Sequence, residues 1–224
     1  LAELEAKAIR AQMNPHFIFN SLNAIQETII TEKVDAAYDY LSRFSKLLRM
    51  VLDNSEKNFI SLNSELETIR LYLSLEALRF SQSFTYSIEL DEALDIEDIF
   101  IPPLLLQPFV ENAIWHGLIS KEGEKKLLLH FAESNGVLAC IIEDNGVGRK
   151  KAARIKEQKL GSGSFESKGT RLALQRIEIL NREKPGSASI TTIDLYDEDG
   201  MARGTKVLIK LSTDPVVNKN TGHD

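Results

Sequence analysis

The sequence predicts an α+β fold, with an antiparallel helical hairpin followed by an α/β sandwich that has a mixed, mainly antiparallel sheet. Two observations carry this prediction. Residues 1–80 show the apolar spacings of three and four that are typical of helices, whereas apolar and polar residues begin to alternate near residue 83. Short turns between the strand-like segments favour antiparallel pairs. We therefore expect a helical region over residues 1–80, a second domain over residues 81–212 and a disordered tail over residues 213–224.

The composition limits the classes of protein to which the chain can belong. Its 224 residues are 43% hydrophobic, and its formal net charge of −6 argues against general nucleic-acid binding. The single cysteine, Cys140, rules out an intrachain disulfide, and the apolar run around it favours a buried side chain over a nucleophile. No stretch approaches the roughly 18 to 20 apolar residues that span a bilayer, and no signal peptide is evident. Residues 1–9 read as the middle of a helix, so we expect a fragment that continues from an upstream helix.

The first helix is expected over residues 1–30, with Pro15 as an interruption. Either the helix kinks at this proline, or a new helix begins there with Asn14 as its cap. On an ideal helix, the residues from 16 onward form two opposite stripes, one apolar and one polar. The apolar stripe contains Ile18, Leu22, Ile25 and Ile29, and the polar stripe contains His16, Asn20, Asn23 and Glu27. A histidine that a helix aims at solvent is placed to react, although an ordinary solvated face is the alternative.

Two further helices follow a short turn near residues 31–34, which makes the first two helices antiparallel neighbours. The second helix carries a heptad-like seam of Ala37, Leu41, Phe44, Leu48 and Val51. The third is expected to begin at a capping box formed by Ser64 and Glu67, and it carries Leu66, Ile69, Leu73 and Phe80. Because one hairpin cannot bury two apolar faces well, we expect a homodimer through a four-helix bundle. A monomeric bundle packed on the rest of the chain is the alternative.

The second domain is expected to alternate strands with helices. Strands are predicted over residues 84–90, 126–132, 137–143, 188–196 and 205–211. One helix is introduced by Pro102 and Pro103 and ends at Gly117, and another covers residues 171–181. The segments 134–136 and 197–200 read as turns that close two hairpins.

A candidate nucleotide site begins where the strand over residues 137–143 ends. Asp144 can accept a hydrogen bond from an exocyclic amine, and Gly146 and Gly148 let the backbone approach a flat ring closely. An ordinary Asp-Asn-Gly turn is the alternative. Residues 149–159 then carry six basic side chains against one acid, which predicts a flexible basic loop, or otherwise a solvated charge run.

The loop leads to Lys168, Gly169 and Thr170 at the start of a helix, where free N–H groups and the helix dipole favour phosphate. The chain contains no P-loop motif. Asn112 offers an amide oxygen suited to Mg2+, and His116 lies one turn later on the same face, within reach of phosphates.

Taken together, these segments resemble the LytS-type sensor histidine kinases over about residues 8–212. Residues 12–20, QMNPHFIFN, resemble the phosphoacceptor motif of that family, with His16 as the acceptor. Residues 107–117, QPFVENAIWHG, resemble its N box, with Asn112 as the implied Mg2+ ligand. Asp144 begins a segment like the G1 box, whose acid reads the adenine amine, and Thr205 matches a threonine that assists this contact.

The resemblance implies that the ATP-binding part is a Bergerat fold, as in gyrase and MutL. Two departures from the family pattern affect the site. The second glycine box has Arg171 in place of a glycine, so phosphate contacts are expected from Gly169, Thr170 and Arg171. His16 is followed by Phe17 rather than by an acid, which leaves Glu111 or solvent as the general base.

The implied activity is that of an ATP-dependent protein-histidine kinase with ATP and Mg2+ at its site. It would phosphorylate His16 and pass the phosphoryl group to an aspartate of a response regulator of the LytTR type. The fragment would be the cytoplasmic region of a membrane sensor. Asn20, one turn after His16, is a candidate for orienting a water that dephosphorylates the regulator; its alternative role is to bond the backbone freed by Pro15. A Bergerat-fold ATPase without a histidine acceptor and a degenerate dimeric scaffold are the competing functions.

Overall fold

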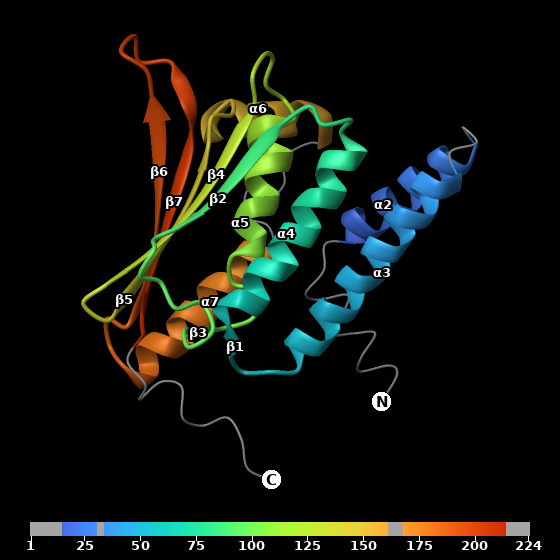
Figure 1. Ribbon diagram of the computed structural model, residues 1–224. Helices are drawn as coiled ribbons and strands as arrows, with labels where there is room; N and C mark the ends of the chain where they lie inside the picture. Colours follow the sequence, from blue (N-terminus) through green and yellow to red (C-terminus); the bar gives the residue numbers. More distant parts are fainter. Residues whose placement is uncertain (1–14, 31–33, 161–167, 214–224) are drawn as a thin grey trace.

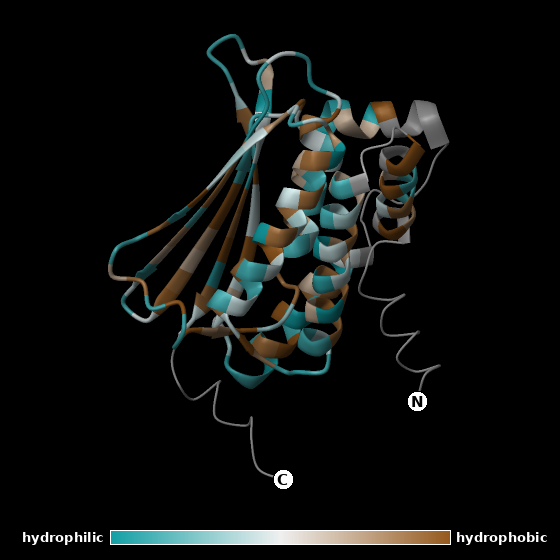
Figure 2. Ribbon diagram, turned by 45° about the vertical axis from the view of Figure 1, so that its right-hand side comes forward, coloured by the Kyte–Doolittle hydropathy of each residue, from teal (hydrophilic) through white to brown (hydrophobic). Residues whose placement is uncertain are grey.

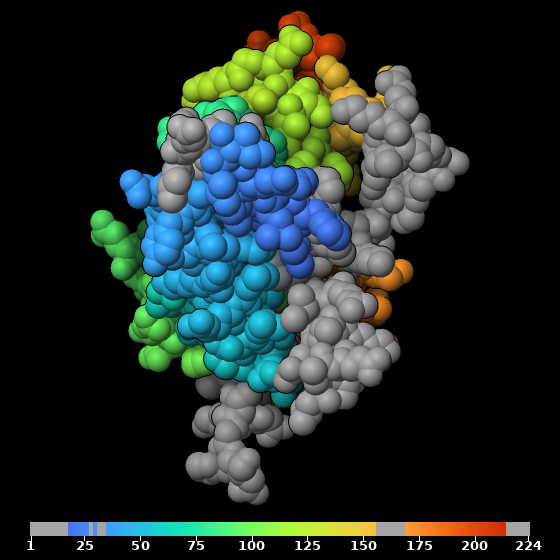
Figure 3. Space-filling model, turned by 90° about the vertical axis from the view of Figure 1, so that its right-hand side faces the viewer, coloured from blue at the N-terminus to red at the C-terminus, as the bar shows by residue number. Residues whose placement is uncertain are grey.

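The computed structural model describes residues 15–30, 34–160 and 168–213. Three helices come first and lie side by side, α2 (Pro15–Ile30), α3 (Val34–Ser55) and α4 (Leu62–Arg79). Beyond them lies a five-stranded sheet whose inner face is covered by α4, α5 (Gln107–Asn112) and α7 (Lys168–Glu183) (Figure 1). The molecule is therefore built in layers, and the hairpin of α2 and α3 forms one face of it (Figure 3).

Helix α2 is described from Pro15 onward, and its expected cap, Asn14, lies with the preceding residues outside the described range, so both alternatives for this proline stay predictions. The predicted apolar stripe is buried only in part. Ile25 is buried and Ile18 packs against the core, but Leu22 and Ile29 are 49% and 55% exposed. Of the predicted polar stripe, Asn20 is half-buried and Asn23 is exposed. The side chains of His16 and Glu27 lie outside the described part of the chain.

The seam predicted for α3 is correct at three of its five positions. Its buried hydrophobic side chains are Ala37, Tyr40, Phe44, Leu47 and Val51. Leu41 is instead 45% exposed and Leu48 half-buried. Because α3 packs against both α2 and α4 within one chain, its buried stripe is rotated toward Tyr40 and Leu47. The predicted antiparallel pairing of the first two helices is consistent with the extensive contact between α2 and α3.

Helix α4 begins earlier than its predicted capping box. The cap is Ser61, whose hydroxyl accepts a hydrogen bond from the Ser64 backbone N–H at 3.2 Å, so the assignment of Ser64 as cap is wrong. Ser61 also ends the short strand β1 (Ile60–Ser61), which pairs with β3 (Phe100–Ile101). This pairing fixes the start of α4 beside the sheet domain.

The main sheet has the strand order β2-β4-β5-β7-β6. The strands are β2 (Thr85–Leu90), β4 (Lys126–Ser134), β5 (Val137–Asp144), β6 (Ala188–Tyr196) and β7 (Ala202–Ser212). Strands β2 and β4 are parallel and the other neighbours are antiparallel, so the predicted mixed, mainly antiparallel sheet is confirmed. Figure 2 shows hydrophobic residues along the central strands, where alternate side chains point toward the helices.

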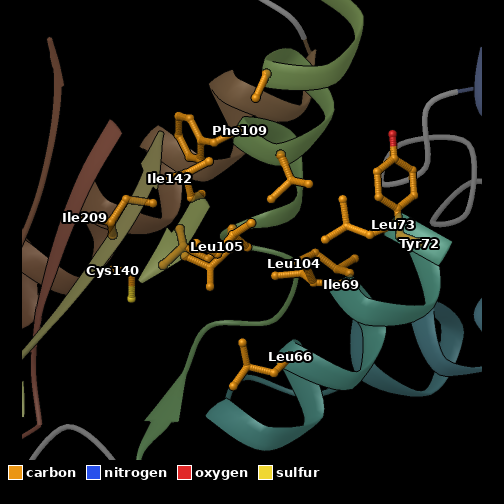
Figure 4. Close-up of a cluster of buried hydrophobic side chains, with 14 of the residues drawn as sticks. Leu66, Ile69, Tyr72, Leu73, Leu104, Leu105, Phe109, Cys140, Ile142 and Ile209 are labelled. Carbon is orange, nitrogen blue, oxygen red and sulfur yellow. The ribbon is translucent and has the colours of Figure 1, made fainter. Parts of the chain in front are cut away.

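One hydrophobic core extends from Ile25 in α2 to Leu211 in β7. Figure 4 shows its centre, where side chains of α4, α5 and the sheet meet. Cys140 lies fully buried there, and burial raises the pKa of its thiol, as expected of a packing residue rather than a nucleophile.

Two predictions in the second domain need correction, the start of one helix and the form of the basic segment. The helix expected from Pro102 and Pro103 begins only at Gln107, because the carboxylate of Glu65 binds the backbone N–H groups of Leu104 and Leu106 and holds the preceding segment in another conformation. The basic segment expected to be a flexible loop is helix α6 (Arg149–Leu160), whose lysines, arginines and alanines are good helix formers. No helix in the described residues is both long and apolar enough to cross a membrane.

Candidate nucleotide-binding site

A cavity of about 670 Å³ opens between the sheet and the helices α5, α6 and α7. Six of the residues predicted for the site border it, although they come from four separate segments of the sequence. They are Asn112, His116, Asp144, Gly148, Thr170 and Thr205. The cavity therefore brings together the segments that resemble the N box, the G1 box and the late threonine motif.

The floor of the cavity is formed by paired residues of three neighbouring strands. Asp144 in β5 lies opposite Thr205 in β7, which in turn lies opposite Asp194 in β6. Directly paired residues point to the same face of a sheet, so all three side chains line the cavity. Asp194 was not predicted from the sequence. The alternation of β6 indicates its face, but the pairing with Thr205 depends on the register between strands.

Asp144 is the most buried ionisable group of the site. Burial raises the pKa of its carboxyl to about 6, while backbone hydrogen bonds from Gly146 and Thr205 act in the opposite direction. The Gly146 N–H donates to Asp144 Oδ1 at 2.8 Å. A carboxylate at the end of a strand, held by the backbone and open to a cavity, is suited to accept a hydrogen bond from an exocyclic amine.

Glycines are required around this carboxylate for steric reasons. A Cβ atom on Gly117 would lie 2.6 Å from Asp144 Oδ1, and one on Gly146 would run into the backbone of Gly117. Gly148 has a φ of +75°, which L side chains rarely adopt. The Val147 N–H donates to the Gly117 carbonyl at 3.1 Å and thus ties the Asp144 loop to the helix that precedes Gly117.

The opposite end of the cavity lies at the start of α7. The Asn112 side-chain amide donates to Thr170 Oγ1 at 2.9 Å, which joins the end of α5 to the first turn of α7. His116 also borders the cavity and is exposed, and Gly169 is half-buried beside Thr170. The first N–H groups of a helix and its dipole attract anions, so this end is suited to phosphate. The side chain of Lys168 lies outside the described residues.

An ion pair that the sequence did not predict closes the rim. Arg149 donates from Nε and Nη2 to the two carboxylate oxygens of Asp194, at 2.7 and 2.8 Å. This contact lowers the pKa of Asp194 and fixes the beginning of α6 to β6. The arginine follows Gly148 directly, so it belongs to the same turn as the glycine motif.

Four predicted residues, Glu111, Gly146, Gly169 and Arg171, are not among the residues that border the cavity, and the side chains of His16 and Lys168 lie outside the described part of the chain. His16 is the second residue of α2, and its side chain lies outside the described residues. Glu111 accepts a hydrogen bond from Gln107 Nε2 at 3.0 Å and is not among the cavity-lining residues. Arg171 is exposed one residue after Thr170.

The donor set suits a hard cation that is held mainly by a bound phosphate. Among the described residues, no three His, Cys, Asp or Glu side chains form a group that could hold a metal ion. Mg2+ needs no such group, since it keeps several waters and is bound by one or two side chains together with phosphate oxygens. The amide oxygen of Asn112 at the phosphate end of the cavity fits that role.

Comparison with known proteins points to one family. The histidine kinase family model matches residues 4–84. A protein of Staphylococcus aureus strain Mu50, named sensor histidine kinase/phosphatase LytS, is 34% identical over 181 residues, which are 80% of this chain and 30% of that relative. The protein of strain N315 with the same name matches equally. The chain thus spans about 30% of the length of these relatives.

One solved structure shows that the fold is shared. A bacterial phosphotransferase superposes with a TM-score of 0.51 at 13% identity, over 93% of this chain and 94% of that one. The histidine kinase domain of the blue-light activated kinase of Erythrobacter litoralis has a TM-score of 0.48 at 16% identity, over 96% of this chain and 97% of that one.

Proposed function

The chain belongs to the histidine kinase family, and from this premise we propose that it is the ATP-dependent autophosphorylating part of a two-component sensor, with His16 as acceptor. The observation that carries the proposal is the cavity, which joins Asp144, Asn112 and Thr170 in a chain whose acceptor-like segment lies within the matched residues. In this proposal residues 1–80 supply the acceptor and the dimer contact, and residues 81–212 bind ATP.

ATP would lie along the cavity with its adenine at the sheet end and its phosphates at the start of α7. The Asp144 carboxylate accepts from the adenine amine, assisted by Thr205, and Gly146 and Gly148 leave room for the ring. The phosphates meet the first turn of α7 with Lys168, Gly169 and Thr170, and His116 lies on the same side. Asn112 would hold Mg2+, which neutralises phosphate charge when bound.

His16 is suited to act as the nucleophile without a strong base. An unperturbed histidine has a pKa near 6.5 and is largely neutral at pH 7, so one ring nitrogen carries a lone pair. This nitrogen attacks the γ-phosphorus in line, the bond from phosphorus to the ADP oxygen breaks, and the remaining ring proton passes to solvent. Because Glu111 is turned toward Gln107, we favour solvent over Glu111 as the proton acceptor. Catalysis then rests on positioning and charge neutralisation.

Exposed apolar side chains on the hairpin support a homodimer. They are Phe19, Leu22, Ile29 and Ile30 of α2 and Tyr38 and Leu41 of α3. A second copy that covers these side chains would complete a four-helix bundle. We further propose that phosphorylated His16 donates to an aspartate of a response regulator of the LytTR type, on the cytoplasmic side of the membrane where ATP is available.

Incubation with γ-labelled ATP tests the proposal directly. The wild-type chain should acquire acid-labile, alkali-stable label, which is typical of phosphohistidine. His16→Gln should lose the label and keep its affinity for ATP, because the acceptor and the nucleotide cavity lie on different elements. Release of free phosphate without label would favour an ATPase, and neither product would favour a scaffold. Persistent label on His16→Gln would move the acceptor to another histidine, with His116 as the first candidate.

A further inference from the structure

Arg79, the last residue of α4, lies against two adjoining aromatic rings. Its guanidinium carbon is 4.2 Å from the centroid of the Phe80 ring and 4.2 Å from that of the Trp115 ring. The two rings meet edge to face, with their centroids 5.4 Å apart. A planar guanidinium stacks on aromatic faces in a way that an ammonium group does not, so this site is specific for arginine.

The same arginine forms a buried ion pair with Glu76. Arg79 Nη2 donates to Glu76 Oε2 at 2.7 Å, and the two side chains are only 10% and 0% exposed. Within the part of the chain that the structure describes, Glu76 Oε1 and Arg79 Nη1 have no hydrogen-bond partner. A buried pair that leaves two atoms unsatisfied is an inefficient way to stabilise a fold, because desolvation offsets much of the attraction. Because the Glu76–Arg79 pair adds little net stability, its position against Trp115 indicates that Arg79 serves to hold Trp115 in place.

Trp115 belongs to a turn of π-helix, η1 (Ala113–Leu118), that directly follows Asn112. The Ile119 N–H donates to the carbonyl of Ile114, five residues earlier, at 2.9 Å, which is the spacing of a π-helix. Turns of this kind are rare and occur often at functional sites. A π-helical turn is preferred over an α-helical one only where tertiary contacts favour it. The Phe80 ring and the Arg79 guanidinium supply such a contact to Trp115, on the side of η1 away from the nucleotide cavity.

The other side of η1 forms a wall of the nucleotide cavity. His116 and Gly117 border the cavity, and Gly117 packs directly against the Asp144 carboxylate. The Gly117 carbonyl also accepts the hydrogen bond from Val147 that ties down the Asp144 loop. A shift of Trp115 by a fraction of an ångström would therefore change the surroundings of Asp144, since the gap at Gly117 has no space for adjustment.

We propose that Arg79 is a positioning residue of the nucleotide site: by stacking on Trp115 it holds η1 in its π-helical form and so keeps Gly117 against Asp144. Arg79 touches no nucleotide. It acts on the recognition of the base, because the part of the cavity that it supports is the part that faces the adenine amine. The consequence for ATP rests on the proposed function, whereas the link from Arg79 to Gly117 is a property of the unliganded chain.

The test compares Arg79→Met and Arg79→Lys with the wild-type chain. Arg43→Met is the matched control, because Arg43 also forms an ion pair, with Asp39 at 2.9 Å, but on the exposed side of α3. Amide hydrogen exchange is measured at Val147, whose N–H binds Gly117, and at Cys140 in the sheet core as an internal reference. Titration calorimetry with MgATP and MgGTP then gives the affinity and the preference for adenine.

Both Arg79 variants should raise the exchange rate of Val147 by roughly 2- to 30-fold more than that of Cys140, the range expected for a lost cation–π contact, because a weakened ion pair with Glu76 lowers overall stability and acts on both amides alike. ATP affinity should fall within the same range, the preference for ATP over GTP should narrow, and Arg79→Lys should show the smaller effect. A uniform rise at Val147 and Cys140 would mean that Arg79 only stabilises the fold, and would overturn the proposal.

The proposal would also be overturned if folded Arg79→Met kept the wild-type exchange rate at Val147 and the wild-type preference for ATP over GTP. If that variant does not fold, Arg79→Lys and Trp115→Phe give the answer by the same two measurements. A wild-type chain that fails to bind MgATP would refute the proposed function, while the exchange of Val147 in the unliganded chain would still decide whether Arg79 holds η1.

Discussion

Asp144→Asn should affect stability and nucleotide binding in opposite directions. In the folded chain, burial raises the pKa of Asp144 from 3.8 to about 6. The ionised carboxylate is therefore disfavoured on folding, and the difference between the two pKa values corresponds to about 3 kcal/mol. Because the folded pKa is raised, this group lowers the free energy of unfolding progressively between about pH 4 and pH 6, and the loss is complete above pH 6. The neutral asparagine removes this cost.

At pH 7 the unliganded Asp144→Asn variant should therefore be at least as stable as the wild type. The gain in the free energy of unfolding should be at most about 3 kcal/mol, reduced by whatever the weakened hydrogen bond from the Gly146 N–H costs. ATP affinity should fall, because a buried acceptor that loses its charge costs about 1–3 kcal/mol of binding, or roughly 5- to 150-fold. Wild-type affinity should also weaken below pH 6, as the carboxyl becomes protonated, and the variant should lack this dependence.

Thermal unfolding and titration calorimetry between pH 5 and pH 8 measure both effects. Glu143→Gln is the control, since Glu143 is the preceding residue of β5, points to the other face of the sheet and pairs with Lys206 at 2.9 Å. An ATP affinity for Asp144→Asn that equals the wild-type value at pH 7 would show that the adenine does not lie at Asp144. A strong loss of stability in the variant would refute the assigned cost of the buried charge.

Three other substitutions test other parts of the site. Asn112→Ala should abolish Mg2+-dependent labelling of His16, and because it also removes the bond to Thr170, ATP titration with and without Mg2+ separates the two effects. Gly117→Ala should weaken ATP binding by at least tenfold, because the added Cβ would lie 2.6 Å from Asp144 Oδ1. Helix propensity alone would instead raise the free energy of unfolding by about 1 kcal/mol, so a stabilised variant with normal ATP affinity would contradict the predicted clash. Asn20→Ala should slow the decay of a prephosphorylated regulator in the presence of ADP, and equal decay rates in a folded, dimeric variant would exclude Asn20 from a phosphatase role.

The sequence predicted the elements whose signals are local. The hairpin between β4 and β5 was identified from the turn signal Ser134-Asn135-Gly136, and in the structure Asn135 and Gly136 both have the positive φ values that such a turn requires. The boundaries of β6 were predicted correctly from alternation and the following turn. In contrast, α6 was missed because its charge suggested a solvated loop, although its residues favour a helix. The start of α5 was misplaced because a distant side chain, Glu65, determines the segment before it.

The same distinction separates the parts of the site that sequence reasoning could find from those that it could not. Asp144, Asn112 and Thr170 lie in short motifs whose residue types state their chemistry, and the structure places them around one cavity. Asp194 was missed, since only the register of β6 with β7 brings it to the row of Asp144 and Thr205.

The π-helical turn was not predictable for a related reason. The residues of η1 are compatible with an ordinary α-helix, and the choice between the two forms depends on contacts with another helix. Arg79 lies in no motif and at the end of a helix, where a basic residue is commonplace because it complements the helix dipole. Its contact with Trp115 exists only because α4 and α5 pack against the same side of the sheet. A motif can therefore identify the atoms that meet a nucleotide, whereas the residues that keep those atoms in place are found through the packing of the fold.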